Sequence, residues 1–536
     1  MSMERKMEVR NCLGRRAALA LGLTLLCGLA GISAADDAVP TPDGGQIPPA
    51  ANVTGSLTER TDLSEADRQR VIGVTEPASS FDEPEPFEAM SGGAATSRKL
   101  ANRDAFSQSS ANLTFAEEER FKLGNALFRK LWVASPSSTQ ASDGLGPLFN
   151  ARACQNCHLK DGRGQPPAAG EPAVSMLIRL GKPAATADEK AALENFLAPA
   201  IPDDTYGGQL QTAAVPGLEP EGQVDIRYEE VPVTLNDGTV VSLRKPHYSL
   251  RDLAYGPLDE GVSLSPRIAN PMIGMGLIQA IHPADLARNA DPEDADDDGI
   301  SGRLAWARGS VASNVVPGRF GWKAQNATVH EQSAEALAGD IGISSPPVPR
   351  SYGDCTEAQT ACFAQPNGEQ ERLGPTEAPD PVIGLIAFYS ENLAVPERRN
   401  VGDETVLAGK EAFYGAGCAS CHTPKFVTRR DASNKAHAFQ LIWPYSDFLL
   451  HDMGEGLADG QQVGRANGRE WRTQPLWGIG LTETVSGHTL FLHDGRARNL
   501  EEAILWHGGE AQSARDAYAA MEKPEREALI AFLESL

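Results

Sequence analysis

The clearest helical pattern in this 536-residue chain lies near residue 120, where apolar side chains fall on one side of a predicted helix: Phe121, Leu123, Leu127 and Phe128. Thr114 precedes this stretch, and a threonine at that place caps the first turn of a helix. Ordered structure is therefore expected to begin near Thr114. A second helix is predicted over Pro381–Leu393.

Three short sequences occur twice in the same order, which indicates an internal duplication. The pairs are Leu123–Phe128 with Ala408–Phe413, Pro271–Leu277 with Pro475–Leu481, and Leu385–Phe388 with Leu529–Phe532. Each set surrounds one Cys-x-x-Cys-His sequence. The chain is therefore expected to hold two copies of one domain, the first enlarged by insertions.

One of these insertions has the pattern of a β-hairpin. Val224–Val233 and Val240–Leu243 are rich in β-branched residues, and they flank the turn sequence Asn236-Asp237-Gly238. This is the small β insertion expected in the first domain.

The first residues have the pattern of an export signal. Basic residues up to Arg16 precede the apolar run Ala17–Ala30, and Ser33-Ala34-Ala35 offers small residues for cleavage. The prediction is a signal peptide over residues 1–35 and a periplasmic mature protein. No later stretch approaches 18 apolar residues, so no stable membrane span is expected. Residues 36–113 are acidic and rich in Pro and Gly, which predicts an extended leader.

The charge of the chain narrows the choice of partners. The formal net charge is −24, which argues against nucleic acid, because phosphate requires a basic surface. A basic redox protein would be attracted electrostatically. The 52 Gly and 37 Pro, with only 6% aromatic residues, suggest much irregular backbone.

Six of the eight cysteines lie outside the signal peptide. Cys154, Cys157, Cys418 and Cys421 belong to the two Cys-x-x-Cys-His sequences. Cys355 and Cys362 lie seven positions apart, and a local disulfide is expected in an oxidising compartment, with a redox-active dithiol as the alternative.

The spacing Cys-x-x-Cys-His is that of c-type haem attachment. The two thiols add to the two vinyl groups, and the adjacent histidine reaches the iron. Two covalently bound haems are therefore predicted, with His158 and His422 as axial ligands. Zinc is a weaker alternative, since each motif lacks a second pair of ligands nearby.

The second axial ligand of each iron decides whether the protein only carries electrons or also binds peroxide. For the second haem the residues leave several candidates: His451, Met453, His488, His493 and His507.

An acidic loop offers a separate metal site. Asp294, Asp296 and Asp298 alternate before Gly299, as suits Ca²⁺ coordination by several oxygens. No glutamate stands at the twelfth position, and a solvated acidic turn is the equal alternative.

Several segments resemble the bacterial dihaem cytochrome c peroxidase superfamily. The sequences that carry this resemblance are Leu490–Arg496 (LFLHDGR), Leu500–Ile504 (LEEAI) and Phe448–Gly454 (FLLHDMG). The chain is most similar to its dihaem oxidoreductase subgroup, also called thiol oxidoreductases. That likeness rests on Gly146–Arg152, Leu457–Gly460, Gly274–Gln279 and Phe320–Lys323, and on the hairpin and the acidic loop. It covers roughly residues 115–536.

The resemblance implies ligands for both irons. In the peroxidases a methionine ligand of the C-terminal haem follows the Leu-x-Glu-Ala helix, and His507 takes that place here. His507 is therefore expected opposite His422, with Met453 as the alternative, and this exchange would lower the haem potential. The peroxidases carry a carboxylate or an amide beside the other haem, where Gln279 and His282 are the nearest matches. Met176, Met272, Met275 or His247 would instead close that iron.

The resulting expectation is a mainly α fold of two cytochrome c-like haem domains, over residues 114–395 and 403–536. The function expected is a periplasmic, peroxidase-like dihaem oxidoreductase. It would accept electrons from a small redox protein at the C-terminal haem and pass them to the N-terminal haem and on to peroxide or another oxidant. Trp306 or Trp322 could bridge the haems. The alternatives are an electron-transfer cytochrome for a redox or iron-uptake partner, and long-range oxidation of a partner protein.

Overall fold

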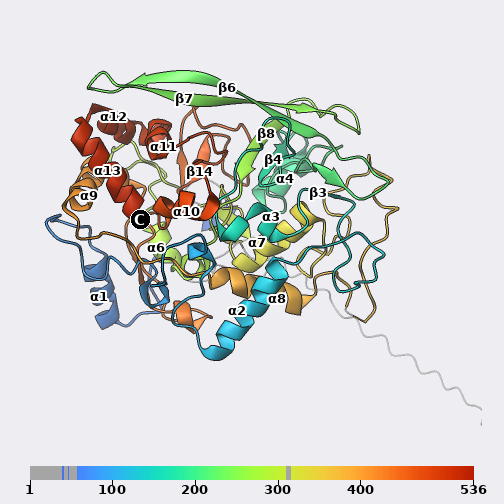
Figure 1. Cartoon of the computed structure of the whole chain (residues 1–536), viewed down its shortest axis with the longest axis horizontal. Helices are drawn as coiled ribbons and strands as arrows, with labels where there is room; N and C mark the ends of the chain where they lie inside the picture. Colours follow the sequence, from blue (N-terminus) through green and yellow to red (C-terminus); the bar gives the residue numbers. More distant parts are fainter. Residues whose placement is uncertain (1–38, 41–45, 48–56, 310–314, 373) are drawn as a thin grey trace, which may run out of the picture. The chain divides into compact units, whose positions relative to one another are not determined.

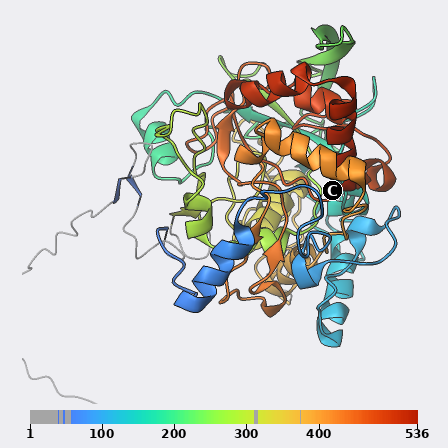
Figure 2. The same ribbon diagram turned by 90° about the vertical axis from the view of Figure 1, so that its left-hand side faces the viewer.

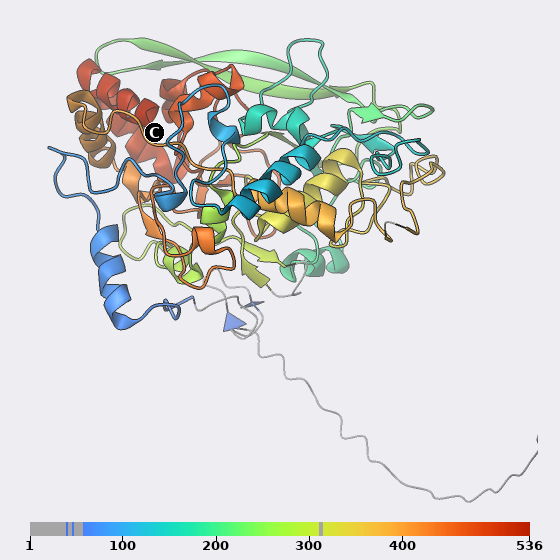
Figure 3. The same cartoon turned by 60° about the horizontal axis from the view of Figure 1, so that its bottom comes forward.

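Two helix pairs of similar construction organise the chain in the computed structural model (Figure 1), which describes residues 39–40, 46–47, 57–309, 315–372 and 374–536. Helix α2 (Phe115–Phe128) packs on α8 (Asp380–Glu391), and α9 (Glu404–Gly415) packs on α13 (Lys523–Ser535). Figure 3 shows the first pair side by side, and Figure 2 shows the second. The helices predicted at Thr114 and over Pro381–Leu393 are confirmed, and Thr114 caps α2 in a capping box with Glu117.

The other helices are short. They are α1 (Glu65–Thr75), α3 (Cys154–Cys157), α4 (Ala187–Glu194), α5 (Met275–Gln279), α6 (Pro283–Ala287), α7 (Val329–Ala336), α10 (Thr482–Ser486), α11 (Leu500–Leu505) and α12 (Gln512–Ala520). No described helix is long and apolar enough to cross a membrane.

The described strands form two-stranded antiparallel pairs. The pairs are β1 (Val39–Pro40) with β2 (Gln46–Ile47), β3 (Leu148–Phe149) with β5 (Ala213–Ala214), β4 (Met176–Gly181) with β8 (Ser263–Ile268), β6 (Gln223–Thr234) with β7 (Val240–Arg251), β9 (Trp306–Arg308) with β10 (Val315–Pro317), β11 (Phe426–Val427) with β12 (Leu441–Ile442), and β13 (Leu450–Asp452) with β14 (Glu470–Arg472).

The expectation of a mainly α fold is wrong. The structure is 29% helical and 16% strand, and strand pairs occur in both halves of the chain. The reason is local: long connections between the helices carry β-branched and aromatic residues, and these pair as short ladders that satisfy backbone groups where no helix forms. Cytochrome c-like domains are not shown by this arrangement.

Glycines permit the close contact of each helix pair. A Cβ on Gly124 would stand 2.3 Å from the carbonyl oxygen of Leu385, and a Cβ on Gly409 would stand 1.9 Å from that of Ala528. These glycines occupy equivalent positions of the sequence repeat. The repeat therefore preserves a backbone-to-backbone helix crossing.

The repeated turn sequences meet each other. Gly274 and Gly478 have φ of 71° and 73° and begin equivalent turns. A Cβ on Gly274 would touch the ring of Trp477 at 2.3 Å, and a Cβ on Gly478 would touch Ile273 at 2.6 Å. Since Ile273 and Trp477 are themselves equivalent, the contact is reciprocal, like the isologous contact of a symmetric dimer.

The predicted hairpin is present and extends further than its sequence pattern suggested, with Gln223 opposite Arg251 and Thr234 opposite Val240. Its tip lies on the C-terminal helices, because the amide of Asn236 donates to the carbonyl of Ala519 and Arg526 pairs with Asp237 at 2.7 Å. Figure 1 shows this ribbon running past α11 and α12. Residues 38–536 form one compact unit, and the domain boundary near residue 400 stays a prediction.

The signal peptide predicted over residues 1–35 lies outside the described residues. The extended leader is wrong for residues 57–113, which contain α1 and bury Phe106. Carboxylates there neutralise buried lysines of the C-terminal half: Lys410 pairs with Glu85 at 2.8 Å and with Glu88 at 3.0 Å. Composition alone could not reveal these partners, since they lie more than 300 positions away.

Candidate haem sites

Both Cys-x-x-Cys-His sequences fold as one turn with the same hydrogen bond. The amide of His158 donates to the carbonyl of Cys154 at 3.1 Å, and the amide of His422 donates to that of Cys418 at 2.9 Å. This turn holds the two cysteines of each motif close together and puts the histidine at its end. Cys154 and Cys157 form α3, and Cys418 begins a short 3-10 turn.

The two histidines have equivalent surroundings. Nδ1 of His158 lies 2.9 Å from the carbonyl oxygen of Asn270, and Nδ1 of His422 lies 2.9 Å from that of Tyr445. A carbonyl can only accept, so Nδ1 carries the proton and Nε2 is left with its lone pair. Burial lowers the pKa of each imidazole to about 4. Both histidines are therefore neutral at pH 7, as metal ligation requires.

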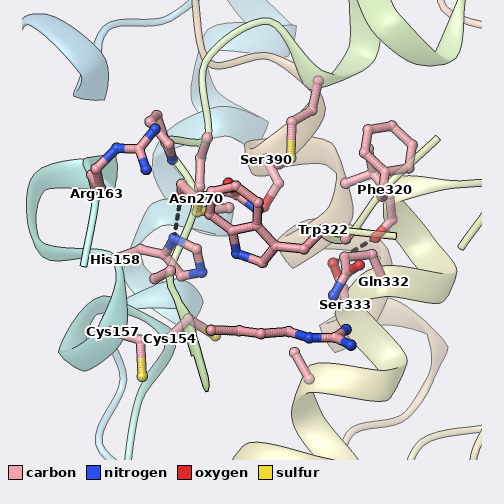
Figure 4. A pocket seen from close by; sticks show the side chains of 18 of the residues that line it. Cys154, Cys157, His158, Arg163, Asn270, Phe320, Trp322, Gln332, Ser333 and Ser390 are labelled. Carbon is pink, nitrogen blue, oxygen red and sulfur yellow. Dashed lines mark hydrogen bonds between the residues drawn. The ribbon is translucent and has the colours of Figure 1, made fainter. Parts of the chain in front are cut away.

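His158 opens into a cavity, here called the His158 cavity. Figure 4 shows His158 on one side of it, Gln332 and Ser333 of α7 on the other, and Trp322 between. Its wall also includes Phe128, whose ring centre lies 6.3 Å from that of His158. In the described residues, no second histidine lines this cavity.

Buried arginines give the His158 cavity a positive wall. They are Arg163, Arg267, Arg319 and Arg472, and burial lowers the pKa of each to about 10. Arg163 donates to the carbonyl of Leu492, and Arg319 donates to those of Pro317 and Ile281. Among the described residues, Nε of Arg163 and Nε of Arg319 are buried without a hydrogen-bond partner. A buried guanidinium without a partner is unfavourable, and an anion relieves this cost. This wall therefore suits a ligand that carries carboxylates.

His422 opens into a second cavity, here called the His422 cavity, and His507 lines it as well. Nδ1 of His507 lies 2.8 Å from the carbonyl oxygen of Ala503, so its Nε2 is also left free. Burial lowers the pKa of His507, and the nearness of His507 contributes, after burial, to the low pKa of His422. The predicted ligand pair is thus brought together, whereas the alternative Met453 does not line this cavity. The ligation itself stays a prediction.

The remaining candidates for the second haem are engaged elsewhere. His451 lies between Asp447 at 2.8 Å and Glu510 at 2.7 Å, which raise its pKa well above the usual value and keep it a cation, against the effect of burial. His493 stacks on Trp471 at 3.9 Å. His488 lies 3.1 Å from the carbonyl oxygen of Arg163.

Three of the residues predicted to lie beside the first haem, Gln279, His282 and Met176, do not line the His158 cavity. Gln279 bonds Glu391 at 3.0 Å, and His282 caps α6 by accepting from the amide of Ala284. Met176 lies on β4 between Ser175 and Leu177, which do line the cavity. Because side chains alternate along a strand, Met176 points to the opposite, core face, where it is buried.

Two glutamines that the sequence analysis did not single out, Gln325 and Gln332, line the cavity. Asn326 donates to Oε1 of Gln332 at 3.1 Å, and Oε1 of Gln325 is buried without a partner. No local motif marks these glutamines. Only their nearness to Phe320–Lys323, one of the family-like segments, pointed to this part of the chain.

His247, Met272 and Met275 are the other candidates for the second axial ligand of the first haem. His247 pairs with Glu229 on the surface, whereas Met272 and Met275 line the His158 cavity. Met272 and Met275 follow Asn270, whose carbonyl binds His158. Of the two tryptophans considered as bridges, Trp322 lines the cavity and Trp306 does not.

The acidic loop brings Asp294, Asp296 and Asp298 together, with their carboxylate oxygens within 4.8 Å of one another. Oδ1 of Asp294 accepts the amide of Gly299, and Oδ1 of Asp298 accepts the amide of Ile300. Calcium binding stays a prediction. Elsewhere, Cys355 and Cys362 are joined by a disulfide.

Both cavities fit a haem. Each has two thiols and a neutral histidine at one end, and the orphaned guanidinium nitrogens of the first offer partners for propionates. Two such sites in one chain define a protein built to hold two haems. The chain belongs to the family described as "Di-haem oxidoreductase, putative peroxidase", whose family model matches residues 87–536. No curated protein matches the chain closely enough to be compared.

Proposed function

We propose that this protein is a periplasmic dihaem c-type oxidoreductase that receives electrons at the His422 site and uses them to reduce peroxide at the His158 site. The observation that carries the proposal is the difference between the two cavities. A second imidazole, that of His507, lies in the His422 cavity, whereas the described part of the His158 cavity offers amides and arginines instead. Covalent attachment through Cys154, Cys157, Cys418 and Cys421 belongs to this proposal.

The charges around the two sites favour electron flow in that direction. Two imidazole ligands lower a haem potential relative to an imidazole and a thioether. Positive charge favours the reduced state, which is less positive by one charge. Five arginines and one carboxylate, that of Asp340, line the His158 cavity, whereas Asp298 and Glu510 outnumber Arg515 in the lining of the His422 cavity. The His158 site should therefore have the higher potential.

The reciprocal turn contact supplies a short route between the sites. Trp477 lines the His158 cavity, while its neighbours Leu476 and Ile479 line the His422 cavity. Trp477 also packs on Gly274 of the other turn. An aromatic ring in this wall shortens the gap that an electron must cross, and we assign the bridging role to Trp477 rather than Trp306 or Trp322.

At the His158 site the protein positions the oxidant and its proton. A bound haem would supply an iron that takes a peroxide oxygen and exchanges electrons. Gln332 and Gln325 line the cavity and would donate or accept a hydrogen bond at the bound peroxide. The guanidinium of Arg179, in the same wall, favours negative charge there.

Optical spectra of the purified holoprotein test the proposal. We expect one high-spin haem that changes on addition of peroxide and one low-spin haem that is oxidised as it donates. If both haems stay low-spin and ignore peroxide, with Met272 or Met275 closing the first iron, the protein is an electron carrier and the proposal is wrong.

Replacing Gln332 by alanine should slow peroxide reduction by about 10- to 100-fold, because an amide at the reacting oxygen is lost. Stopped-flow rates with hydrogen peroxide measure the effect. The matched control is Gln69→Ala, which removes a surface glutamine of α1. Equal rates in both variants would exclude Gln332 from the reaction.

A basic redox protein of the periplasm remains the proposed electron donor, on the strength of the net charge of −24. Its association rate should fall as salt screens the attraction.

A further inference from the structure

A side cavity of about 580 Å³ adjoins the His158 cavity and is within the size range of small-molecule sites. Four residues line both cavities: Arg179, Arg267, Gln325 and Gln332. The two spaces therefore share a wall at the side chains that the proposed function assigns to the oxidant.

Cations collect at this shared wall. Lys323 also lines the side cavity, and it is buried, as is Arg267. Both cations pair with one carboxylate, that of Asp459, at 2.9 Å from Lys323 and at 3.9 Å from Arg267. The single carboxylate of Asp459 can neutralise only one of the two cations, Lys323 and Arg267. A net positive charge therefore remains beside these two side chains.

The carboxylates of the side cavity do not cancel this charge. Arg350 adds to the cations of its lining, and its acidic members are Glu335 and Asp354, of which Asp354 lies 3.8 Å from Arg350. Arg179, Arg267, Lys323 and Arg350 alone outnumber these two carboxylates in the lining. The cavity is therefore cationic in a chain with a net charge of −24.

Another part of the lining is apolar. Phe196 and Trp306 are buried and pack in one hydrophobic cluster, and Leu450 and Val463 continue this surface. A ligand that matches both the cationic and the apolar parts of the lining has an anionic end and an apolar body about the size of a ring.

We propose that the side cavity binds an organic anion, a carboxylate or sulfonate on an apolar body, with its charged end at Arg179, Arg267 and Lys323 and its body against Trp306 and Phe196. The proposal adds to the proposed function a class of ligand for the space beside the His158 site, where peroxide remains the substrate. It rests on the proposed function only in treating that site as the reactive one.

Calorimetric titration of the dihaem holoprotein without peroxide tests the inference, with benzoate as the anionic probe and benzyl alcohol as its neutral match. We expect benzoate to bind at least about tenfold more tightly, because its carboxylate makes charge-assisted hydrogen bonds. Replacing Trp306 by alanine should weaken both probes about fivefold, through loss of the ring contact.

Arg179→Gln should remove most of the preference for benzoate. Its haem content is measured by absorbance, because Arg179 also lines the His158 cavity. If that variant loses haem, Lys323→Met serves instead, since Lys323 is one of the three proposed contacts and lines only the side cavity of the two. Arg103→Gln, which removes an exposed arginine outside both cavities, should leave both affinities unchanged.

Three results would overturn the inference. The first is equal affinity for the two probes, and the second is no benzoate binding at about 10 mM. The third is benzoate binding that is unchanged by the Arg179 and the Trp306 substitutions. Binding is measured without peroxide. An absent benzoate signal would therefore leave peroxide reduction standing, and an absent peroxide reaction would leave the anion site standing.

Discussion

Replacing His507 by alanine is expected to convert the haem held by His422 from low-spin to high-spin, while the other haem keeps its spectrum. The two imidazoles share one cavity, and carbonyls at Ala503 and Tyr445 fix both Nδ1 protons, so that each Nε2 can ligate. Without the imidazole of His507, the iron would have either water or no ligand in its place. The ligand field would then be weaker. Absorption and electron paramagnetic resonance spectra of the oxidised protein measure the change.

The variant His507→Met extends this test to the potential. A thioether in place of imidazole should keep the haem low-spin and raise its potential by on the order of 0.1 V, a fraction of the range that axial ligands span. Met453→Ala is the matched control, because Met453 does not line the cavity. A low-spin haem in His507→Ala together with a high-spin haem in Met453→Ala would reverse the assignment.

Replacing Gly409 by alanine is expected to lower the thermal midpoint by about 1–3 °C and to weaken retention of the C-terminal haem. The new Cβ would stand 1.9 Å from a backbone carbonyl oxygen of α13. The helices must then separate, and such overpacking costs about 1–3 kcal/mol. Circular dichroism on heating, with haem absorbance followed in parallel, measures both effects.

Gly384→Ala provides the control for this change. Gly384 lies inside α8, and a Cβ added there would have no other atom within 4 Å beyond its own helix, so alanine should raise stability by about 0.5–1 kcal/mol. Gly124→Ala, at the equivalent crossing, should behave like Gly409→Ala. If Gly409→Ala and Gly384→Ala shift the midpoint alike, the close helix crossing does not stabilise the fold.

The sequence repeat carried more structural information than the composition did. Equivalent glycines occupy equivalent crossings, and the equivalent turns at Gly274 and Gly478 pack on each other. Composition misled in two places. It suggested an extended leader over a segment in which Glu85 and Glu88 neutralise Lys410. It also gave no sign of the strand pairs in the segments that connect the helices.

The sequence alone predicted the chemistry of the two Cys-x-x-Cys-His motifs. A Cys-x-x-Cys-His turn is closed by contacts between residues four apart, so its spacing alone predicts the thiols and the adjacent histidine. The choice of His507 among five candidates came from the resemblance to the peroxidases, in which a methionine ligand follows the corresponding Leu-x-Glu-Ala helix. Only the tertiary structure decided which side chains face the first cavity. Arg163 lies more than 150 positions before Arg319, Gln325 and Gln332, and the direction in which a strand or turn presents its side chains depends on packing that no local pattern encodes.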